Sequence, residues 1–194
     1  MKIAITGNIG SGKSTFVKFA EDSKFPVLRA DNISKEILEK DVKVKSLVVK
    51  EFGEKSYTNG KTNKSFLAKE VFNDAIKLKK LESILHPRVI KSIQKLSSEL
   101  LKKNKIVFIE AALIFEADME DIFDFVVLIT AKRDIRLSRK KMTGLTDEDF
   151  LKRELNQISE EEKKKRADFI FSNDTSIEDL KMKFNLLMLT LGIK

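Results

Sequence analysis

The sequence of 194 residues contains no cysteine, and this absence excludes several classes of protein. Without cysteine the chain has no disulfide framework, no thiolate metal site and no thiol redox chemistry of its own. The absence of disulfides is typical of proteins in reducing compartments, so we expect a cytoplasmic protein.

Long apolar segments are missing as well. The longest apolar runs, such as Phe125–Ile129, are far shorter than the roughly 20 residues that a helix needs to cross a bilayer. The chain begins with the strand-like segment Lys2–Thr6 and shows none of the features of a secretory signal. We therefore expect no association with a membrane.

The chain has only one tyrosine and no tryptophan, which counts mildly against stacking on nucleic-acid bases, although the net charge is +8. A basic surface attracts nucleic acid, anionic lipid or a phosphorylated small molecule, and composition does not choose among them. The excess consists mostly of lysines scattered through helical stretches, which is typical of solvated helix faces. We expect a small-molecule substrate, no nucleic-acid partner, and a monomer or weak homo-oligomer.

The apolar runs that are present predict a parallel sheet. They are short and continuous, as in strands that are covered on both faces, and they occur at Lys2–Thr6, Pro26–Leu28, Lys105–Glu110, Phe125–Ile129 and Phe169–Phe171. We predict one α/β domain over residues 1–194, with three layers and five parallel strands.

Two helical sections interrupt this pattern. Residues 32–101 show helical spacing, broken at Asn59-Gly60 and His86-Pro87 but without a convincing strand, and this is more than one crossover needs. We predict a helical substrate-binding insert there. The charged residues 132–160 predict either an exposed helical hairpin or a mobile lid.

The segment Gly7–Ser14 matches the pattern G-x-x-x-x-G-K-[ST] and lies between a predicted strand and a predicted helix. Glycines in such a loop let backbone N–H groups turn towards phosphate oxygens, and the positive end of the helix dipole lies at the same place. This predicts a P-loop fold that binds ATP with Mg²⁺. The expected contacts are backbone N–H groups of Gly10, Ser11 and Gly12, the Lys13 ammonium at the β- and γ-phosphates, the Ser14 hydroxyl at the metal, and Thr15 at the α-phosphate.

ATPases, GTPases and small-molecule kinases share this loop, so the rest of the chain must separate them. From the first strand to about Asn173 the sequence resembles the dephospho-CoA kinase family. The matching pieces are Gly7–Thr15, Ala30-Asp31, His86-Pro87, Leu113–Glu116, Arg139, Gln157, Arg166–Asp168 and Asn173. The resemblance implies transfer of the γ-phosphoryl group of ATP to the 3′-hydroxyl of the ribose in dephospho-CoA.

Asp31 corresponds to the catalytic carboxylate proposed for that family. An acid at the end of the second strand faces the crevice outside the sheet, where ligands of such folds bind. It either orients or deprotonates the attacking hydroxyl, or it holds Mg²⁺ through water. The family has Asp-Ala-Asp where this chain has Arg29-Ala30-Asp31, which changes the local charge.

The resemblance also implies that His86, Leu113 and Glu116 border the acceptor. From the residues alone, His86 is equally suited to capping or packing, Leu113 to the core, and Glu116 to the surface.

Positive residues of the lid, Lys132, Arg136, Arg139 and Lys140, fall on or near one helix face. Arg139 corresponds to the lid arginine of the family, which stabilises the transferring phosphoryl group, and Arg136 is our second candidate. A further arginine of the family is absent here, where Met142–Gly144 stands; Lys140 or Lys141 would replace it without the planar fork of arginine.

Arg166 and Asn173 match family positions near the adenine of ATP, although Arg166 also fits as one more cation in a charged helix. Two other functions compete with this interpretation. One is phosphorylation of another acceptor, such as a nucleoside monophosphate or shikimate. The other is nucleic-acid binding by an ATPase.

Overall fold

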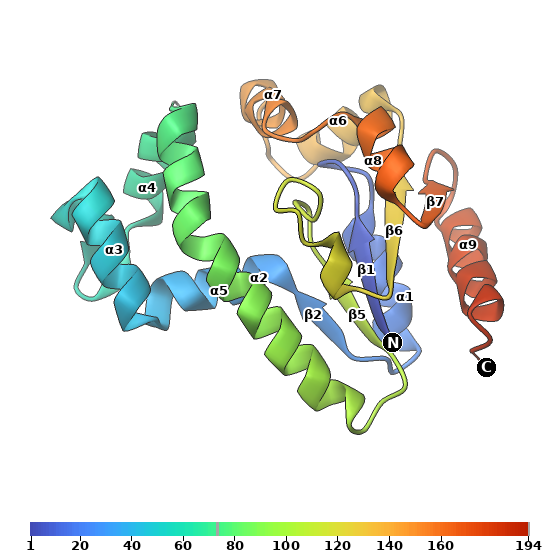
Figure 1. Cartoon of the computed structure of the whole chain (residues 1–194). Helices are drawn as coiled ribbons and strands as arrows, with labels where there is room; N and C mark the ends of the chain where they lie inside the picture. The colour runs from blue at the N-terminus through green and yellow to red at the C-terminus, as the bar shows by residue number, and fades with distance from the viewer. Residues whose placement is uncertain (73, 194) are drawn as a thin grey trace. The chain divides into compact units, whose positions relative to one another are not determined.

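The structure is a computed structural model that describes residues 1–72 and 74–193 (Figure 1). Its elements follow in the order β1 (Lys2–Thr6), α1 (Lys13–Asp22), β2 (Val27–Arg29), α2 (Ala30–Lys40), α3 (Val42–Phe52), η1 (Glu54–Ser56), β3 (Tyr57–Thr58), β4 (Lys61–Thr62), α4 (Lys64–Phe72), α5 (Ala75–Leu101), β5 (Val107–Glu110), η2 (Glu120–Ile122), β6 (Phe125–Thr130), α6 (Arg133–Lys141), α7 (Asp147–Leu155), α8 (Glu160–Arg166), β7 (Phe169–Ser172) and α9 (Ile177–Thr190).

Five strands form one sheet in the order β2-β5-β1-β6-β7, and the predicted fold class is confirmed. β1 pairs in parallel with β5, where Ile5 lies opposite Glu110, and with β6, where Thr6 lies opposite Leu128. β6 pairs in parallel with β7. The carboxyl ends of these strands therefore meet at one edge of the sheet, where the loop after β1 begins.

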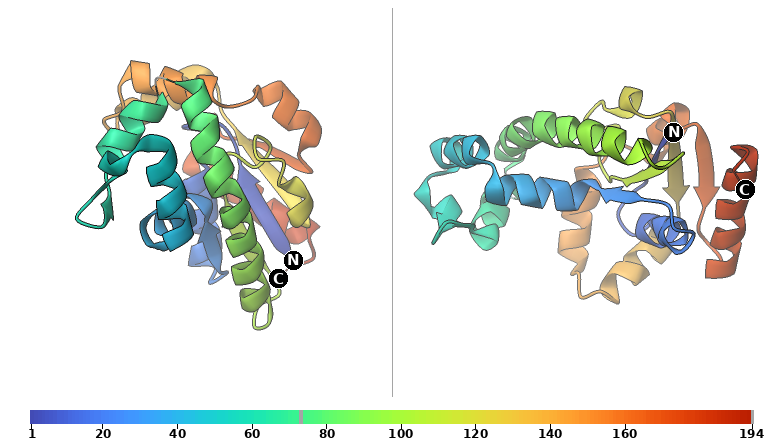
Figure 2. Two further views of the ribbon diagram at one scale, coloured as in Figure 1. Left: turned by 60° about the vertical axis from the view of Figure 1, so that its left-hand side comes forward. Right: turned by 90° about the horizontal axis from the view of Figure 1, so that it is seen from below.

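The packing of the sheet explains why the sequences of its central strands are continuously apolar. On one face, Ile3, Ile5 and Phe108 pack against α1 and α9 in a single cluster of buried residues. On the other face, Val107 and Leu128 are also fully buried, and α8 packs against β6. In Figure 2, α9 lies along the edge strand β7. Burial on both faces leaves no polar alternation in the central strands.

The chain divides into two compact units, residues 1–28 with 97–194, and residues 29–96. The first unit holds most of the sheet and the phosphate loop. The second is mainly helical, and its own core contains Val44, Val48, Leu67 and Leu85, with Ile37, Leu38, Phe52 and Tyr57 packed against them.

Two local features of residues 29–96 differ from the expectation of helices alone. β3 and β4 form a two-stranded antiparallel hairpin whose turn residues, Asn59 and Gly60, both have positive φ angles. Asn-Gly is the preferred sequence for such a turn, but two-residue strands are too short to show an alternating pattern. The expected break at His86-Pro87 is wrong, because α5 continues through Pro87.

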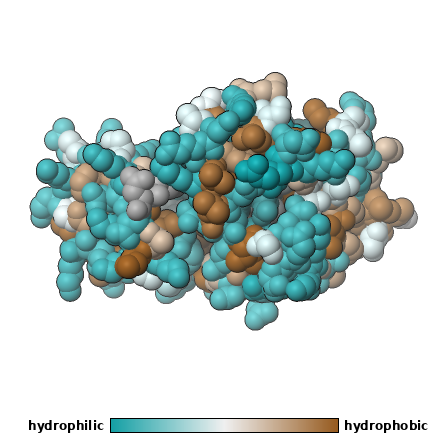
Figure 3. Space-filling view, turned by 90° about the horizontal axis from the view of Figure 1, so that it is seen from above, coloured by the Kyte–Doolittle hydropathy of each residue, from teal (hydrophilic) through white to brown (hydrophobic). Residues whose placement is uncertain are grey.

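The surface agrees with the high content of charged residues. The face shown in Figure 3 is mostly hydrophilic, with apolar side chains in separate patches. Among the described residues, no helix has both the length and the apolar character that a membrane span requires.

The core makes a stability prediction at Phe184, which is 3% exposed and contacts the rings of Phe16, Phe19 and Phe108. We expect Phe184→Ala to lower the free energy of unfolding by about 3–5 kcal/mol, because it leaves a cavity in the core. Met182→Ala, at a 63% exposed position of the same helix, should change it by less than about 0.5 kcal/mol. Urea unfolding measures both, and equal losses would contradict the assigned core.

Candidate active site

The phosphate loop, residues 7–14, connects β1 to α1. It turns tightly, since the Ser11 N–H donates to the Asn8 carbonyl at 3.1 Å, and it ends at Gly12, the residue before α1. The N-terminus of α1 therefore faces the loop, and its dipole favours an anion there.

Two glycines of this loop are required by close approach as well as by conformation. Gly12 has a φ of 102°, and a Cβ atom there would lie 2.1 Å from the Asn173 side-chain nitrogen. Gly10 has a φ of 80°, and its Cβ atom would lie 2.6 Å from the Arg136 carbonyl oxygen. Any side chain at either position would push the loop away from the elements that support it.

Lys13 and Ser14 are the two residues of the motif whose side chains are expected to contact the phosphates and the metal ion. The Lys13 ammonium donates to the carbonyls of Gly7 at 2.8 Å and Asn8 at 3.2 Å. The Ser14 hydroxyl donates to Glu110 Oε1 at 2.5 Å. Glu110 is the last residue of β5, the strand next to β1, and our sequence analysis did not assign it to the site. An acid at the end of a strand was the available signal, but only the strand order places it beside Ser14.

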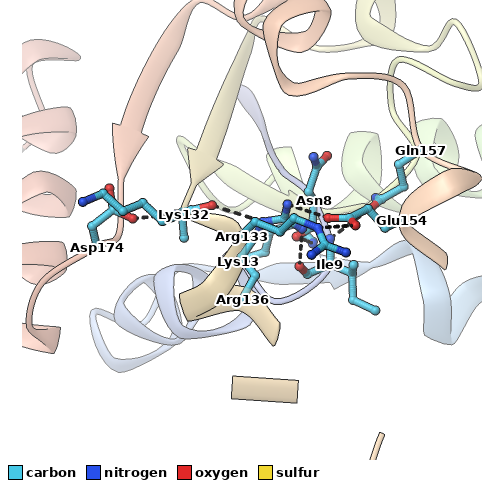
Figure 4. A network of polar contacts seen from close by, with 10 residues as sticks. Asn8, Ile9, Lys13, Lys132, Arg133, Arg136, Glu154, Gln157 and Asp174 are labelled. Atoms are coloured by element: carbon cyan, nitrogen blue, oxygen red, sulfur yellow. Dashed lines mark hydrogen bonds and ion pairs between the residues drawn. The ribbon is translucent and has the colours of Figure 1, made fainter. Parts of the chain in front are cut away.

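Three side chains from distant parts of the chain hold the backbone of the loop, and two of them, Arg136 and Gln157, are labelled in Figure 4. The Asn173 side-chain nitrogen donates to the Ser11 carbonyl at 2.8 Å. Arg136 Nη1 donates to the Ile9 carbonyl at 3.2 Å, and the Ile9 N–H donates to Gln157 Oε1 at 2.8 Å. Asn173 thus contacts the loop itself, and Gln157, which we noted only as a family match, joins it.

Arg136 is committed to the protein interior. It is only 6% exposed, and besides Ile9 it donates to the Ala131 carbonyl at 3.1 Å and to Glu154 Oε1 at 2.7 Å. Glu154 also pairs with Arg133 at 2.8 Å. Burial by itself would raise the pKa of Glu154, but the hydrogen bonds and charges of Arg136 and Arg133 outweigh it and lower that pKa below the usual value.

Arg139, the predicted lid arginine, lies one turn further along α6. Its guanidinium donates to the Asn173 carbonyl at 2.9 Å, on the residue that also holds the Ser11 carbonyl. The structure therefore brings Arg139, Asn173 and the phosphate loop together.

Glu116 contacts the segment that follows α7. Its Oε1 accepts a hydrogen bond from the Ile158 N–H at 3.0 Å and pairs with the Lys163 ammonium at 2.9 Å. The Lys163 side chain is fully buried; burial lowers its pKa, and the Glu116 carboxylate opposes that effect. Lys163 lies in a run of charged residues, and nothing in the sequence predicted that its side chain is buried.

Arg166 is not brought together with Asn173, because the two residues lie at opposite ends of β7. Its guanidinium pairs with Asp118 at 3.0 Å and with Glu120, and it lies 5.0 Å from the centre of the Phe115 ring. Leu113, two residues before Phe115, is half-buried, whereas Phe115 is buried.

The unit of residues 29–96 holds two further predicted site residues. Asp31 is exposed in the first turn of α2, directly after β2, and His86 is half-buried within α5. The same unit contains a cavity of about 730 Å³. Apolar side chains, lysines and two glutamates line it together, among them Leu38, Leu67, Lys35, Lys61, Glu36 and Glu39.

The family model and the curated relatives described here carry one family description. Residues 1–179 match the family model described as dephospho-CoA kinase. Dephospho-CoA kinase of Fusobacterium nucleatum is 33% identical over 187 residues, which cover 93% of each chain. The enzyme of the same name from Thermus thermophilus is 36% identical over 195 residues, which cover 99% of this chain and 93% of that one.

Solved structures agree. A Thermus thermophilus protein is 34% identical with a TM-score of 0.81, over 98% of this chain and 97% of that chain. Dephospho-CoA kinase from Campylobacter jejuni is 29% identical with a TM-score of 0.74, over 98% of both chains. Shikimate kinase from Bacteroides thetaiotaomicron is 15% identical with a TM-score of 0.59, over 100% of this chain and 99% of that chain, a likeness of fold alone.

The pKa of Glu154 makes a prediction about pH. Because this pKa is lowered in the folded state, the carboxylate contributes stability above its unfolded pKa of about 4.3, and that stability is lost as the pH falls through the folded value. We expect Glu154→Gln to lower the free energy of unfolding by about 1–3 kcal/mol at pH 7 and by much less at pH 3. Urea unfolding at both pH values tests this, and an equal loss at the two would refute it.

Proposed function

Because this chain belongs to the dephospho-CoA kinase family, we propose that it transfers the γ-phosphoryl group of ATP to the ribose 3′-hydroxyl of dephospho-CoA, giving coenzyme A and ADP. The observation that carries the proposal is the complete phosphate loop at the carboxyl end of β1, in a chain that matches the family from residue 1 to 179.

On the nucleotide side, the backbone N–H groups of Gly10, Ser11 and Gly12 hold the phosphates of ATP, and Thr15 lies in the first turn of α1 for the α-phosphate. The Lys13 ammonium moves from its carbonyl partners to the β- and γ-phosphates. Arg139 stabilises the charge of the transferring group, which its contact with Asn173 beside the loop supports.

The residues at the mouth of the loop fit Mg²⁺. Mg²⁺ prefers oxygen ligands and usually takes one or two protein groups together with substrate phosphates and water. The Ser14 hydroxyl would hold the ion directly and the Glu110 carboxylate would hold it directly or through water, since the two side chains already touch. Among the described residues, no group of three or more His, Cys, Asp or Glu side chains is placed to hold a metal ion. When bound, the ion neutralises charge on the β- and γ-phosphates.

On the acceptor side, Asp31 accepts the proton of the 3′-hydroxyl or orients it, and His86 and Leu113 border the substrate. We propose that the helical residues 32–101 form the acceptor-binding insert. Their cavity supports this, because its four lysines outnumber its two glutamates, and lysines next to apolar side chains suit a substrate that has phosphate groups and a long organic chain.

Three further predicted contact residues keep their places in this proposal. Glu116 borders the acceptor, Arg166 lies near the adenine of ATP, and Arg136 is the second candidate for the transferring phosphoryl group; without a ligand, each is bound to another protein group. The lid, residues 132–160, closes over the phosphates through Arg139 and excludes water that would compete with the acceptor. A cytoplasmic setting and a monomer or weak homo-oligomer stay predictions from the sequence.

The function is tested by incubating the protein with ATP, Mg²⁺ and dephospho-CoA and detecting coenzyme A and ADP by mass. Shikimate and nucleoside monophosphates serve as competing acceptors, and Lys13→Ala should abolish turnover. If another acceptor is phosphorylated faster, the acceptor assignment fails; if none is phosphorylated, the kinase assignment fails.

Asp31→Asn separates chemistry from nucleotide binding. We expect kcat to fall by about 100-fold or more, since the amide cannot accept the hydroxyl proton, while the Kd for ATP stays within about twofold. Asp22→Asn, an exposed carboxylate at the other end of α1, is the control and should behave as wild type. An unchanged kcat in Asp31→Asn would remove this residue from the chemistry.

Glu110→Gln tests the metal assignment. We expect the Mg²⁺ concentration for half-maximal turnover to rise by about 10-fold or more, because the variant loses a negative oxygen ligand next to Ser14. Glu99→Gln, an exposed carboxylate in α5, should leave it unchanged. The assignment fails if both variants show the Mg²⁺ dependence of the wild-type protein.

A further inference from the structure

Both backbone polar groups of Ile9 are held by side chains that come from far along the chain. The Ile9 N–H donates to Gln157 Oε1 at 2.8 Å, and the Ile9 carbonyl accepts from Arg136 Nη1 at 3.2 Å. Ile9 is the third residue of the phosphate loop, directly before Gly10. Figure 4 shows Gln157 and Arg136 near Ile9, and Glu154 beside Arg136.

These contacts meet a requirement of the loop. A loop that turns its N–H groups towards an anion cannot pair its own backbone groups as a helix or sheet does, and each buried group left without a partner costs free energy. Ile9 has no side-chain hydrogen-bonding group that could hold its own backbone. The position of the Ile9 backbone is therefore set by the two side chains that bind it.

Both side chains are themselves fixed. Gln157 Nε2 donates to the Ala112 carbonyl at 3.4 Å, and the next residue, Ile158, is held through its N–H by Glu116 at 3.0 Å. The other anchor, Arg136, is buried and bound to Glu154 at 2.7 Å. Gln157 and Arg136 are thus each bound to a group outside the loop, and this fixes the position in which they hold the Ile9 backbone.

We propose that Gln157 is a positioning residue for phosphoryl transfer. It holds the Ile9 N–H, opposite Arg136 on the carbonyl, and keeps the phosphate loop in its anion-binding conformation before the nucleotide arrives. This inference rests on the proposed function, since it assumes that the loop binds ATP. Preorganisation raises affinity because binding then need not order the loop. Gln157 and Arg136 both lie in the proposed lid, residues 132–160. Their hydrogen bonds to Ile9 therefore link the position of the lid to that of the phosphate loop.

The test replaces Gln157 with methionine, which keeps the length of the side chain and removes both hydrogen-bonding groups. We expect the Kd for MgATP, measured by calorimetry without acceptor, to rise about 5- to 30-fold. Hydrogen exchange of the Ile9 amide, measured by NMR, should become at least about 10-fold faster. Gln157→Glu keeps an acceptor for this N–H and should restore its protection.

Asn104→Leu is the matched control. Asn104 also uses a side-chain amide to bind a backbone carbonyl, that of Leu100 at 2.8 Å, but at the C-terminal end of α5. This variant should lower the melting temperature without changing the Kd for MgATP or the exchange of the Ile9 amide. In steady-state kinetics, Gln157→Met should raise the KM for ATP and leave the KM for the acceptor within about twofold.

The outcomes separate this inference from the proposed function. If wild-type protein makes no coenzyme A but Gln157→Met still weakens MgATP binding and exposes the Ile9 amide, the positioning role stands and the acceptor assignment falls. If wild-type protein makes coenzyme A and Gln157→Met binds MgATP as tightly as wild type, the positioning role is overturned. A loss of melting temperature in Gln157→Met equal to that of the control, without a change in Kd, would also overturn it.

Discussion

The structure around the phosphate loop depends on one constraint: a backbone that offers its N–H groups to an anion must have its other polar groups paired elsewhere. The bonds of Ser11 and Ile9 to Asn173, Arg136 and Gln157 satisfy that constraint. All three partners come from beyond β6, although the loop follows β1. The parallel sheet makes this possible, because it brings the carboxyl ends of β1, β6 and β7 to one edge.

The same constraint divides the cations near the loop into two groups. Arg136 is buried and donates to the Ala131 carbonyl and to Glu154, so its charge supports the protein structure. Lys13 donates to the carbonyl oxygens of Gly7 and Asn8, and Arg139 donates to the Asn173 carbonyl beside the loop. A neutral carbonyl oxygen is a weaker partner for a cation than a phosphate oxygen, so a bound nucleotide can displace these hydrogen bonds.

The net charge of +8 is spread over helix surfaces more than it is focused at the site. Many lysines pair with an acid one turn away, as Lys40 does with Glu36 and Lys164 with Glu160. Exposed pairs of this kind contribute little stability, about 0–1 kcal/mol each. Lys163 is the exception, since it is fully buried against Glu116 and holds α8 to the loop after β5. Most of these lysines therefore lie on solvent-exposed helix faces, whereas Lys163 stabilises the packing of α8.

The sequence by itself determined the fold class and the phosphate loop, because continuous apolar runs and the spacing of Gly7, Gly12 and Lys13 are local signals. It did not reveal the β3–β4 hairpin or the unbroken helix through Pro87, since two-residue strands carry no periodicity and packing overrode the proline signal. The sequence also did not reveal which residues bind Ile9 and Ser14. Gln157 and Glu110 lie about a hundred residues or more from the loop, and only the order of the strands and the packing of α6 and α7 decide that they meet it.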